Sequence, residues 1–414
     1  MNLELDIARR IARAPLGGSR SVMERIAVAS VALSVAVMLL SIAIITGFKR
    51  EISRRISDFS SHVVVTDPRS LGSLDAEPLR IDRALDSLAA CDPAFRRAAR
   101  YALRGGIVRT AEAVEGVLLK GVDAAYDLAP FEGWLVEGAL PRIGDTIRAK
   151  EVLLPRELAR RLALAAGDRF ELLYAEADAR LRRDRFKVAG IYASGMDELD
   201  RTTLLTDLRN VQRLAGWAPD EVSGCEIRLD RLEAAPAFAE GLDRRLFYDE
   251  SERFDRLAAM CVQALYPNIF DWLKAHDVNA AVILTIMLVV AFFNLSAALL
   301  TVVLERIRMI GLLRALGMTR RSLRRIFRYR AAIIALRGLA WGNAAGLALC
   351  LVQRHFGLVR LDAEGYLLSV VPIALEAGWW LLLNAGFAAA IFLLMLLPAS
   401  AVASVKPDET MRYE

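Results

Sequence analysis

The sequence is poor in the residues that build metal and redox centres. Its 414 residues include four cysteines and three histidines, and no two cysteines stand in a CxxC spacing. Structural zinc sites need clustered cysteine and histidine ligands, so the sequence predicts none. We expect the cysteines to be unpaired thiols, with a Cys91–Cys225 disulfide as the alternative.

A phosphate-binding loop is missing as well. No stretch reads GxxxxGK[ST], and no other cofactor fingerprint is present. Ser194 and Gly195 lie outside any GxSxG frame, and Asp197, Glu198 and Asp200 are more typical of an acidic surface cluster than of an acid–base pair. We therefore predict a chain with no catalytic residues, metal or cofactor of its own. Energy for any work that it performs must come from a partner.

Charge is absent from several long apolar stretches. Residues 26–47 contain no charged side chain, and as a helix they reach roughly 33 Å, enough to cross a bilayer core. A cleaved signal peptide is the alternative, but its apolar part is shorter and a small-x-small cleavage site should follow. Hydrophobic residues make up 55% of the chain, against about 45–50% in soluble domains. The sequence predicts membrane spans at residues 26–47, 278–304, 331–352 and 378–402.

Positive charge is concentrated in the segments that we place in the cytoplasm. Residues 305–330 carry nine arginines and one acid, residues 1–25 are also basic, and the tail 403–414 contains Lys406 and Arg412. Short basic loops stay inside, whereas long domains are translocated regardless of charge. We therefore expect residues 48–277 and the loop 353–377 outside, with both termini in the cytoplasm of a bacterial inner membrane.

The N-terminal segment has an amphipathic pattern. Leu3, Ile7 and Ile11 recur at helical spacing with arginines opposite. This pattern favours a helix lying in the cytoplasmic membrane interface, and an ordinary solvated helix is the alternative.

The segment 48–277 mixes the two hydrophobic periods. Eight stretches read as strands: HVVVTD, YALRGGIVR, VEGVLLKGVD, EVLLP, RFELLY, FKVAGIY, TTLLT and CEIRLD. PLRIDRALDSLAA, RELARRLALA and LRNVQRLAG read as amphipathic helices, with Gly167 as the C-cap after the second. The predicted fold is an α-helical membrane protein with four transmembrane helices and a large two-lobed α+β extracytoplasmic domain between the first two.

The arginine-rich segment 305–330 admits three interpretations. Its arginines can anchor it to anionic lipid, at about 1 kcal/mol each. Nucleic-acid binding is disfavoured, because the loop is held against the bilayer and offers no aromatic platform. As a helix, it places Ile307, Ile310, Leu313 and Gly317 on one face, which suits a coupling helix that docks into another subunit. A second piece begins at Thr319, and Gly317 separates the two.

Two motifs resemble a known family. ERIRMIGLLRALGMTRRSLRRIFRYRA and the closing PASAVASVKPDETMRYE are similar to the segments after the second and fourth spans of FtsX-like permeases of type VII ABC transporters. GFKREISRRISDFSSHVVV and NIFDWLKAHDVNAAVILTIMLVVAFFNLSAALL resemble the lipoprotein-releasing LolC/LolE branch. The resemblance covers nearly the whole chain and has the same order of spans.

What the resemblance implies is a non-catalytic permease. It would form a homodimer or heterodimer with a second permease and bind two ATPase subunits, which hold ATP and Mg²⁺. The ATPase-coupling residues would be Glu305, Arg306, Ile310, Gly311, Leu313, Arg314, Leu316 and Gly317. The cargo would be a lipoprotein or lipid, which a periplasmic carrier then takes up.

A lipid-facing groove is also implied by the resemblance, with Val35, Leu39, Phe292 and Phe293 as its lining. The alternative is that these residues simply meet lipid tails. Asn294 is costly in lipid at mid-span, so it should face protein or a cavity.

One connection departs from the family pattern. The LolC-type subunit has a proline-containing hook that recruits the carrier, whereas the matching connection here, AEADARLRRDR, is short, basic and free of proline. This departure puts direct carrier capture in doubt and favours a LolE-like subunit or a homodimer. A MacB-like efflux permease, an FtsX-like regulator of cell-wall hydrolases and a membrane receptor outside the ABC class are the rival interpretations.

Overall fold

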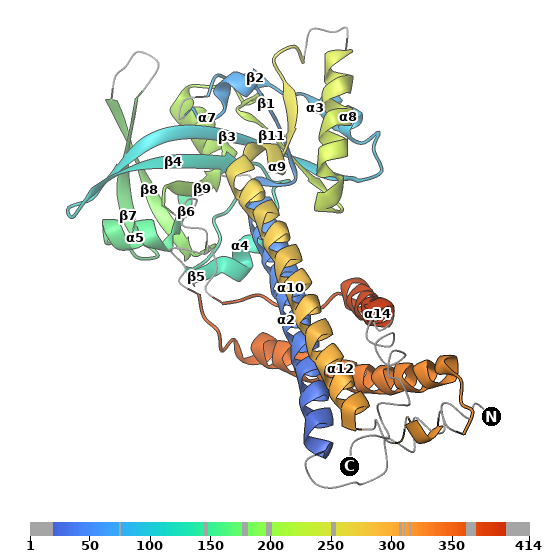
Figure 1. The fold of residues 1–414 in the computed structure, drawn as a ribbon. Coiled ribbons are helices and arrows are strands. Elements are labelled where there is room, and N and C mark those ends of the chain that lie inside the picture. Colours follow the sequence, from blue (N-terminus) through green and yellow to red (C-terminus); the bar gives the residue numbers. More distant parts are fainter. Residues whose placement is uncertain are drawn as a thin grey trace. The chain divides into compact units, whose positions relative to one another are not determined.

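The computed structural model describes residues 20–73, 76–144, 148–175, 181–195, 201–249, 254–305, 309, 311–313, 316–361 and 370–394. The chain divides into two compact units (Figure 1). Unit 1 comprises residues 1–50, 272–360 and 370–414, and unit 2 comprises residues 51–271 and 361–369.

Long helices form unit 1. They are α2 (Arg20–Ser60), α10 (Pro267–Glu305), α12 (Arg320–Phe356) and α14 (Ala377–Leu394), and the first two continue into unit 2. Among the described residues, three segments are long and apolar enough to cross a membrane: Arg25–Ser60, Pro267–Asn294 and Arg321–Phe356. The expected fourth span, 378–402, starts inside α14, and its last eight residues lie outside the described part of the chain.

Glycines let α2 and α12 approach closely. Gly338 and Gly342 of α12 face α2, and an added Cβ would lie 2.5 Å from Val31 at the first position and 2.6 Å from the Ala32 carbonyl oxygen at the second. Gly346 is the next glycine at the same spacing and lies over Ala36. Small residues four apart permit such contact between membrane helices, where van der Waals packing drives association.

An amide pair joins α12 to α14. Asn343 donates to the Asn384 Oδ1 at 2.6 Å and to the Leu339 carbonyl at 2.8 Å, and Asn384 donates back to the Asn343 Oδ1 at 3.1 Å. The Trp380 indole N–H donates to the same Asn343 oxygen at 2.7 Å. With the bond from Asn384 to the Trp380 carbonyl at 2.8 Å, all four amide hydrogens are used.

Unit 2 contains strands and short helices in mixed order. The strands are β1 (Val63–Thr66), β2 (Leu79–Arg80), β3 (Phe95–Arg109), β4 (Val114–Val122), β5 (Leu135–Gly138), β6 (Glu151–Pro155), β7 (Arg169–Ala175), β8 (Leu181–Tyr192), β9 (Thr203–Asp207), β10 (Glu221–Val222), β11 (Gly224–Leu229) and β12 (Ala258–Cys261). The helices are η1 (Pro68–Ser70), α3 (Arg83–Ala89), α4 (Ala129–Trp134), α5 (Arg156–Leu162), α7 (Leu208–Ala215), η2 (Leu232–Ala234), α8 (Ala235–Phe247) and α9 (Val262–Leu265).

Part of the main sheet closes on itself. Its path is β12-β1-β11-β3-β4-β9-β6-β8-β5, and β7 pairs with both β3 and β8. The ring β3-β4-β9-β6-β8-β7 is therefore continuous, with Ile107 opposite Leu173 where β3 meets β7. The pairs β4–β9 and β6–β8 are parallel, and the other pairs of the ring are antiparallel. Closure leaves these six strands without a free edge along the paired stretches.

Two hydrophobic cores stabilise unit 2. One lies between β1, β11 and β12 and the helices α3 and α8; its members include Val63, Ile227, Leu85, Phe238 and Leu242. The other joins the strand ring to α5 and α7; its members include Leu119, Leu154, Leu158, Phe186 and Val211. Figure 1 shows α8 alongside the strands of the first core.

Several local predictions need comment. All eight predicted strands are present, whereas β2, β5, β10 and β12 were not predicted. The prediction that Gly167 caps the helix after β6 is wrong: α5 ends at Leu162 and Ala163 takes the left-handed conformation with φ 53°. Gly167, with φ 97°, instead turns the chain five residues after the helix end. Cys91, Cys225, Cys261 and Cys350 are all free thiols, so the alternative disulfide is not formed.

Candidate functional site

Residues 316–319 of the predicted coupling segment form a tight turn before α12, and residues 320–330 belong to α12. Gly317 has φ 91°, and the Met318 N–H donates to the Leu313 carbonyl at 3.0 Å. This 6→1 bond around a left-handed glycine is the Schellman C-cap. Thr319 then caps α12, because its hydroxyl accepts the Ser322 N–H at 3.2 Å. A non-glycine residue at position 317 would therefore be strained.

This turn exposes two leucines. Leu312 is 64% exposed and Leu316 is 77% exposed, and four-residue spacing puts them on one side of the helical turn. Gly311 and Leu313 are half-buried. Leu312 was missed in the sequence, although its spacing from Leu316 was a usable signal. Arg306, Ile310 and Arg314 lie outside the described residues, as do the acidic residues 197, 198 and 200.

The residues predicted to line a groove fall into separate environments. Val35 is fully buried in the helix core that also contains Ala291, and Leu39 is buried in a second cluster with Cys350. On α10, the rings of Phe292 and Phe293 lie 5.4 Å apart, and Phe293 is 64% exposed. The structure does not bring these four side chains into one cavity within the chain.

Asn294 has a partner on another helix. Its amide donates to the hydroxyl of Ser30 on α2, so its polar group is directed at protein. Nearer the other end of these helices, Lys49 of α2 pairs with Asp277 of α10 at 2.8 Å. The Phe48 ring lies 5.7 Å from that of Trp272, and Trp272 lies 4.5 Å from His276.

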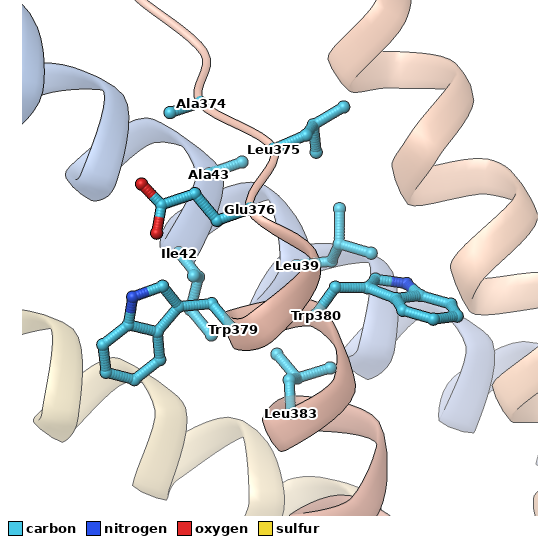
Figure 2. Close-up of a pocket in the computed structure, with 9 residues that line it drawn as sticks. All are labelled: Leu39, Ile42, Ala43, Ala374, Leu375, Glu376, Trp379, Trp380 and Leu383. Carbon is cyan, nitrogen blue, oxygen red and sulfur yellow. The ribbon is translucent and has the colours of Figure 1, made fainter.

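A narrow crevice opens between α2 and the start of α14 (Figure 2). Three chain segments line it: α2, the extended segment before α14, and the first turns of α14. The lining residues are Leu39, Ile42, Ala43, Ala374, Leu375, Glu376, Trp379, Trp380 and Leu383. Its floor is buried and apolar, whereas the two indoles are partly exposed. Two adjacent tryptophans at the start of the last apolar stretch were the available sequence signal.

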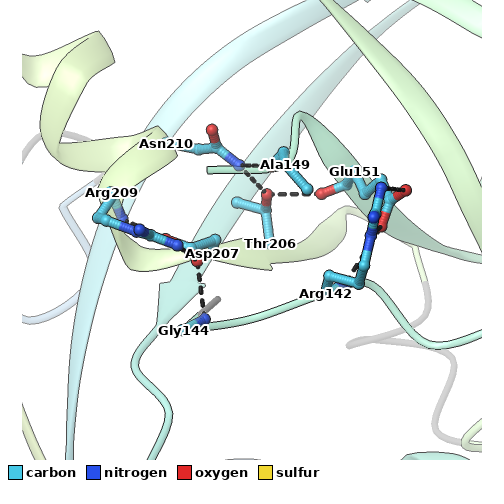
Figure 3. Close-up of polar contacts among 8 residues, drawn as sticks. All are labelled: Arg142, Gly144, Ala149, Glu151, Thr206, Asp207, Arg209 and Asn210. Carbon is cyan, nitrogen blue, oxygen red and sulfur yellow. Dashed lines mark hydrogen bonds and ion pairs between the residues drawn. The ribbon is translucent and has the colours of Figure 1, made fainter. Parts of the chain in front are cut away.

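Carboxylates of unit 2 serve structural contacts (Figure 3). Asp207 accepts the Arg209 N–H at 2.8 Å and the Gly144 N–H at 2.9 Å, and it pairs with the Arg209 guanidinium. Burial opposes its charge, but these hydrogen bonds outweigh burial and hold its pKa below the usual value. Glu151 pairs with Arg142 at 3.0 Å, which lowers its pKa too. Neither arrangement is an acid–base pair poised for catalysis.

The C-terminal end of α2 meets a buried ion pair within unit 2. Lys120 lies 2.6 Å from Glu226 and donates to the Phe59 carbonyl at 2.7 Å. The Tyr126 hydroxyl donates to the same carbonyl at 2.9 Å. Both charged side chains are about 95% buried, and the rings of Phe59 and Tyr126 lie within 5.0 Å of the ammonium. A cation at a helix C-terminus satisfies carbonyls that have no partner in the helix.

The geometry defines a class of protein before any relative is considered. The sequence contains no nucleotide-binding loop. Among the described residues, long apolar helices are present, and a mixed helix–sheet unit is inserted between the first two of them along the chain. This arrangement is that of a helical membrane protein with a large polar domain.

Comparison with known proteins gives the family. Residues 26–245 match the MacB-like periplasmic core domain, and residues 281–407 match the FtsX-like permease C-terminal region. The chain belongs to the family of FtsX-like permeases that carry a MacB-like periplasmic core domain.

Named relatives extend over nearly the whole chain. The lipoprotein-releasing system transmembrane protein LolC of Xylella fastidiosa is 24% identical over 96% of this chain and 95% of its own. The LolE protein of Haemophilus influenzae is 23% identical over 92% of each chain. Among solved structures, the periplasmic region of MacB from Actinobacillus actinomycetemcomitans is 12% identical, with a TM-score of 0.34 over 50% of this chain and 91% of that one.

Proposed function

We propose that this chain is the permease subunit of an ABC transporter that releases lipoproteins from the bacterial inner membrane. The observation that carries the proposal is the match to LolC and LolE proteins over more than nine-tenths of the chain. The family matches at residues 26–245 and 281–407 include both the apolar helices and the inserted domain.

Energy would come from a separate ATPase. The sequence offers no GxxxxGK[ST] loop that could hold nucleotide phosphates. The turn between α10 and α12 would receive the ATPase, because two exposed leucines stand beside a rigid glycine-capped turn. Buried apolar anchors usually dominate such interfaces, and rim charges contribute little.

The topology follows from charge. Residues 305–330 and both termini would be cytoplasmic, residues 48–277 and 353–377 would be extracytoplasmic, and four helices would cross the membrane. A second permease, identical or homologous, would complete the membrane part. A periplasmic carrier would accept the cargo, although the sequence AEADARLRRDR lacks the proline of the LolC-type hook.

Reconstitution tests this function. The purified chain alone should hydrolyse no ATP, and proteoliposomes holding the chain with its ATPase should release a lipoprotein to the soluble fraction only with ATP and a carrier. Robust ATP hydrolysis by the chain alone, or no release by an ATPase-active complex, would overturn the proposal.

Substitutions at the turn test the coupling site. Leu316→Asp or Leu312→Asp puts a carboxylate into the ATPase contact, at a desolvation cost of several kcal/mol per unpaired ion. We expect either change to abolish co-purification of the ATPase from solubilised membranes at equal membrane abundance. Arg325, an exposed residue on the first turns of α12, offers a matched control. If Arg325→Gln releases the ATPase and the leucine changes do not, the segment binds through charge.

Efflux driven across the periplasm is a second candidate, favoured by the match of residues 26–245 to the MacB-like domain. Cells lacking the chain would then become sensitive to exported compounds while lipoproteins are still released. If cells lacking the chain instead accumulate lipoproteins in the inner membrane, lipoprotein release is the function and efflux is not.

A further inference from the structure

The crevice between α2 and α14 combines an apolar slot with a charged mouth. Leu39, Ala43 and Leu383 form its floor, and each is at least 92% buried. The enclosed space is only about 20 Å³, so the crevice is shallow. A shallow apolar crevice of this kind can be covered by a hydrocarbon chain lying along it, whereas it is too small to enclose one.

The slot is fixed by backbone contacts. The Ala374 N–H donates to the Ala43 carbonyl at 3.0 Å, so the extended segment is held against α2. The Thr46 hydroxyl lies 3.3 Å from the Ala374 carbonyl. Gly47 faces Pro372 so closely that an added Cβ would lie 2.4 Å from its carbonyl oxygen. The floor is therefore formed in the chain before any ligand enters.

The mouth carries one carboxylate beside an indole. Figure 2 shows the Glu376 carboxylate and the Trp379 indole directed to the same side of the crevice, with Ile42 between them. Trp379 is 49% exposed, whereas Trp380 is fixed by its bond to Asn343. A carboxylate accepts charge-assisted hydrogen bonds from an ammonium, and an indole face attracts the same cation. A headgroup made only of phosphate or glycerol has no cation, so it can make neither the charge-assisted hydrogen bond to the carboxylate nor the contact with the indole face.

We infer that this crevice binds an ethanolamine phospholipid, with one acyl chain lying along the apolar crevice and the headgroup ammonium between Glu376 and Trp379. The inference rests on the membrane placement in the proposed function, since tryptophans at the end of a span mark the headgroup level. The crevice shares Leu39 with the cargo groove that the family resemblance implies between the first two spans, but its headgroup residues Glu376 and Trp379 belong to the last span and the segment before it. Charge complementarity selects ethanolamine lipids over anionic lipids, which Glu376 repels.

Native mass spectrometry of the detergent-purified full-length chain tests the site. The chain is delipidated and then offered equal amounts of dioleoyl phosphatidylethanolamine and dioleoyl phosphatidylglycerol. We expect a preference for the ethanolamine lipid of about tenfold, which is the size of one partly hydrated charge-assisted hydrogen bond. N-acylated phosphatidylethanolamine, which has the same chains and no ammonium, should lose that preference.

Two variants locate the preference. Glu376→Gln should abolish it while keeping the shape of the mouth, and Trp379→Leu should reduce it while keeping the apolar surface. Lys49→Gln is the control, because Lys49 pairs with Asp277 away from the crevice; it should bind as the wild type does. Equal retention of the two lipids, or an unchanged preference in Glu376→Gln, would overturn the site. The readout needs neither ATP hydrolysis nor lipoprotein release, so failure of the proposed function would be seen separately.

Discussion

His62 is buried where β1 begins, and its neutral form is part of the structure. The Nδ1 atom accepts the Leu229 N–H at 3.0 Å, so protonation there would remove a hydrogen-bond acceptor. Burial and, to a smaller extent, the charge of Arg228 together lower the pKa of His62 to about 4. The residue therefore makes unit 2 sensitive to mild acid.

The sign of the pH effect follows from proton uptake. Unfolded His62 takes up a proton near pH 6.5, whereas the folded side chain does so near pH 4. Between these values the unfolded chain binds more protons, so stability falls as pH falls from 6.5 to 4. We expect the thermal midpoint of the solubilised chain to drop across this window. His62→Asn keeps an acceptor for Leu229 without titrating, and its midpoint should depend less on pH. An identical pH profile in the variant would contradict this assignment.

The pair of Lys120 and Glu226 is the second sensitive position. Burial raises the pKa of Glu226, and the nearby Lys120 ammonium opposes that rise. Lys120→Met would leave a buried carboxylate without its partner, and breaking such a pair costs about 3–5 kcal/mol. Thermal unfolding should show this loss, and Lys120→Met with Glu226→Leu should recover much of it. If the double variant is no more stable than the single one, the contact of Lys120 with the α2 end matters more than the charge pair.

At the scale of elements, the close packing of α2 against α12 depends on glycines of α12, which have no side chain to hold the helices apart. At Gly342 an added Cβ would lie 2.6 Å from the Ala32 carbonyl oxygen and 2.7 Å from the Val35 Cβ. Gly342→Val should force the helices apart, at about 1–3 kcal/mol for overpacking. The thermal midpoint in detergent should fall accordingly.

Gly386 of α14 provides the matched control for this prediction. It is also a glycine in an apolar helix, but an added Cβ would meet nothing within 4 Å. Gly386→Ala should leave the midpoint unchanged or raise it slightly, because alanine is the better helix former. Equal destabilisation by the two substitutions would mean that close approach of α2 and α12 is not what Gly342 provides.

At the scale of the whole molecule, the native thiols report the topology. Cys91 is exposed in unit 2, whereas Cys225 and Cys350 are buried. In spheroplasts with an intact inner membrane, a membrane-impermeant maleimide should therefore label the chain at Cys91. The Cys91→Ser substitution should abolish most of that signal. Thr319→Cys, in the coupling turn, should react only after the inner membrane is opened. The reverse pattern would place the large domain in the cytoplasm.

The sequence predicted individual strands and helices better than it predicted which of them pack against one another. Short apolar runs identified strands such as β4 and β9, because each contributes buried residues to the core. Two-residue strands such as β2 carry no periodicity, so they could not be read. The four-residue spacing of the glycines in α12 can be read from the sequence, but it does not indicate that α2 is the helix packed against them. Likewise, Val35 and Leu39 read as lipid-facing, and only packing puts them inside the helix core.

The sequence alone determined that this chain has long apolar helices, a polar domain between the first two, a basic turn and no nucleotide loop. Those properties follow from composition and period, which need no contact between distant residues. Tertiary structure alone decided that β7 joins β3 to close the strand ring, that Lys120 meets Glu226, and that Glu376 stands beside Trp379 over a slot floored by α2. These depend on which apolar faces bury one another, and many pairings of the same local elements satisfy the sequence pattern equally well.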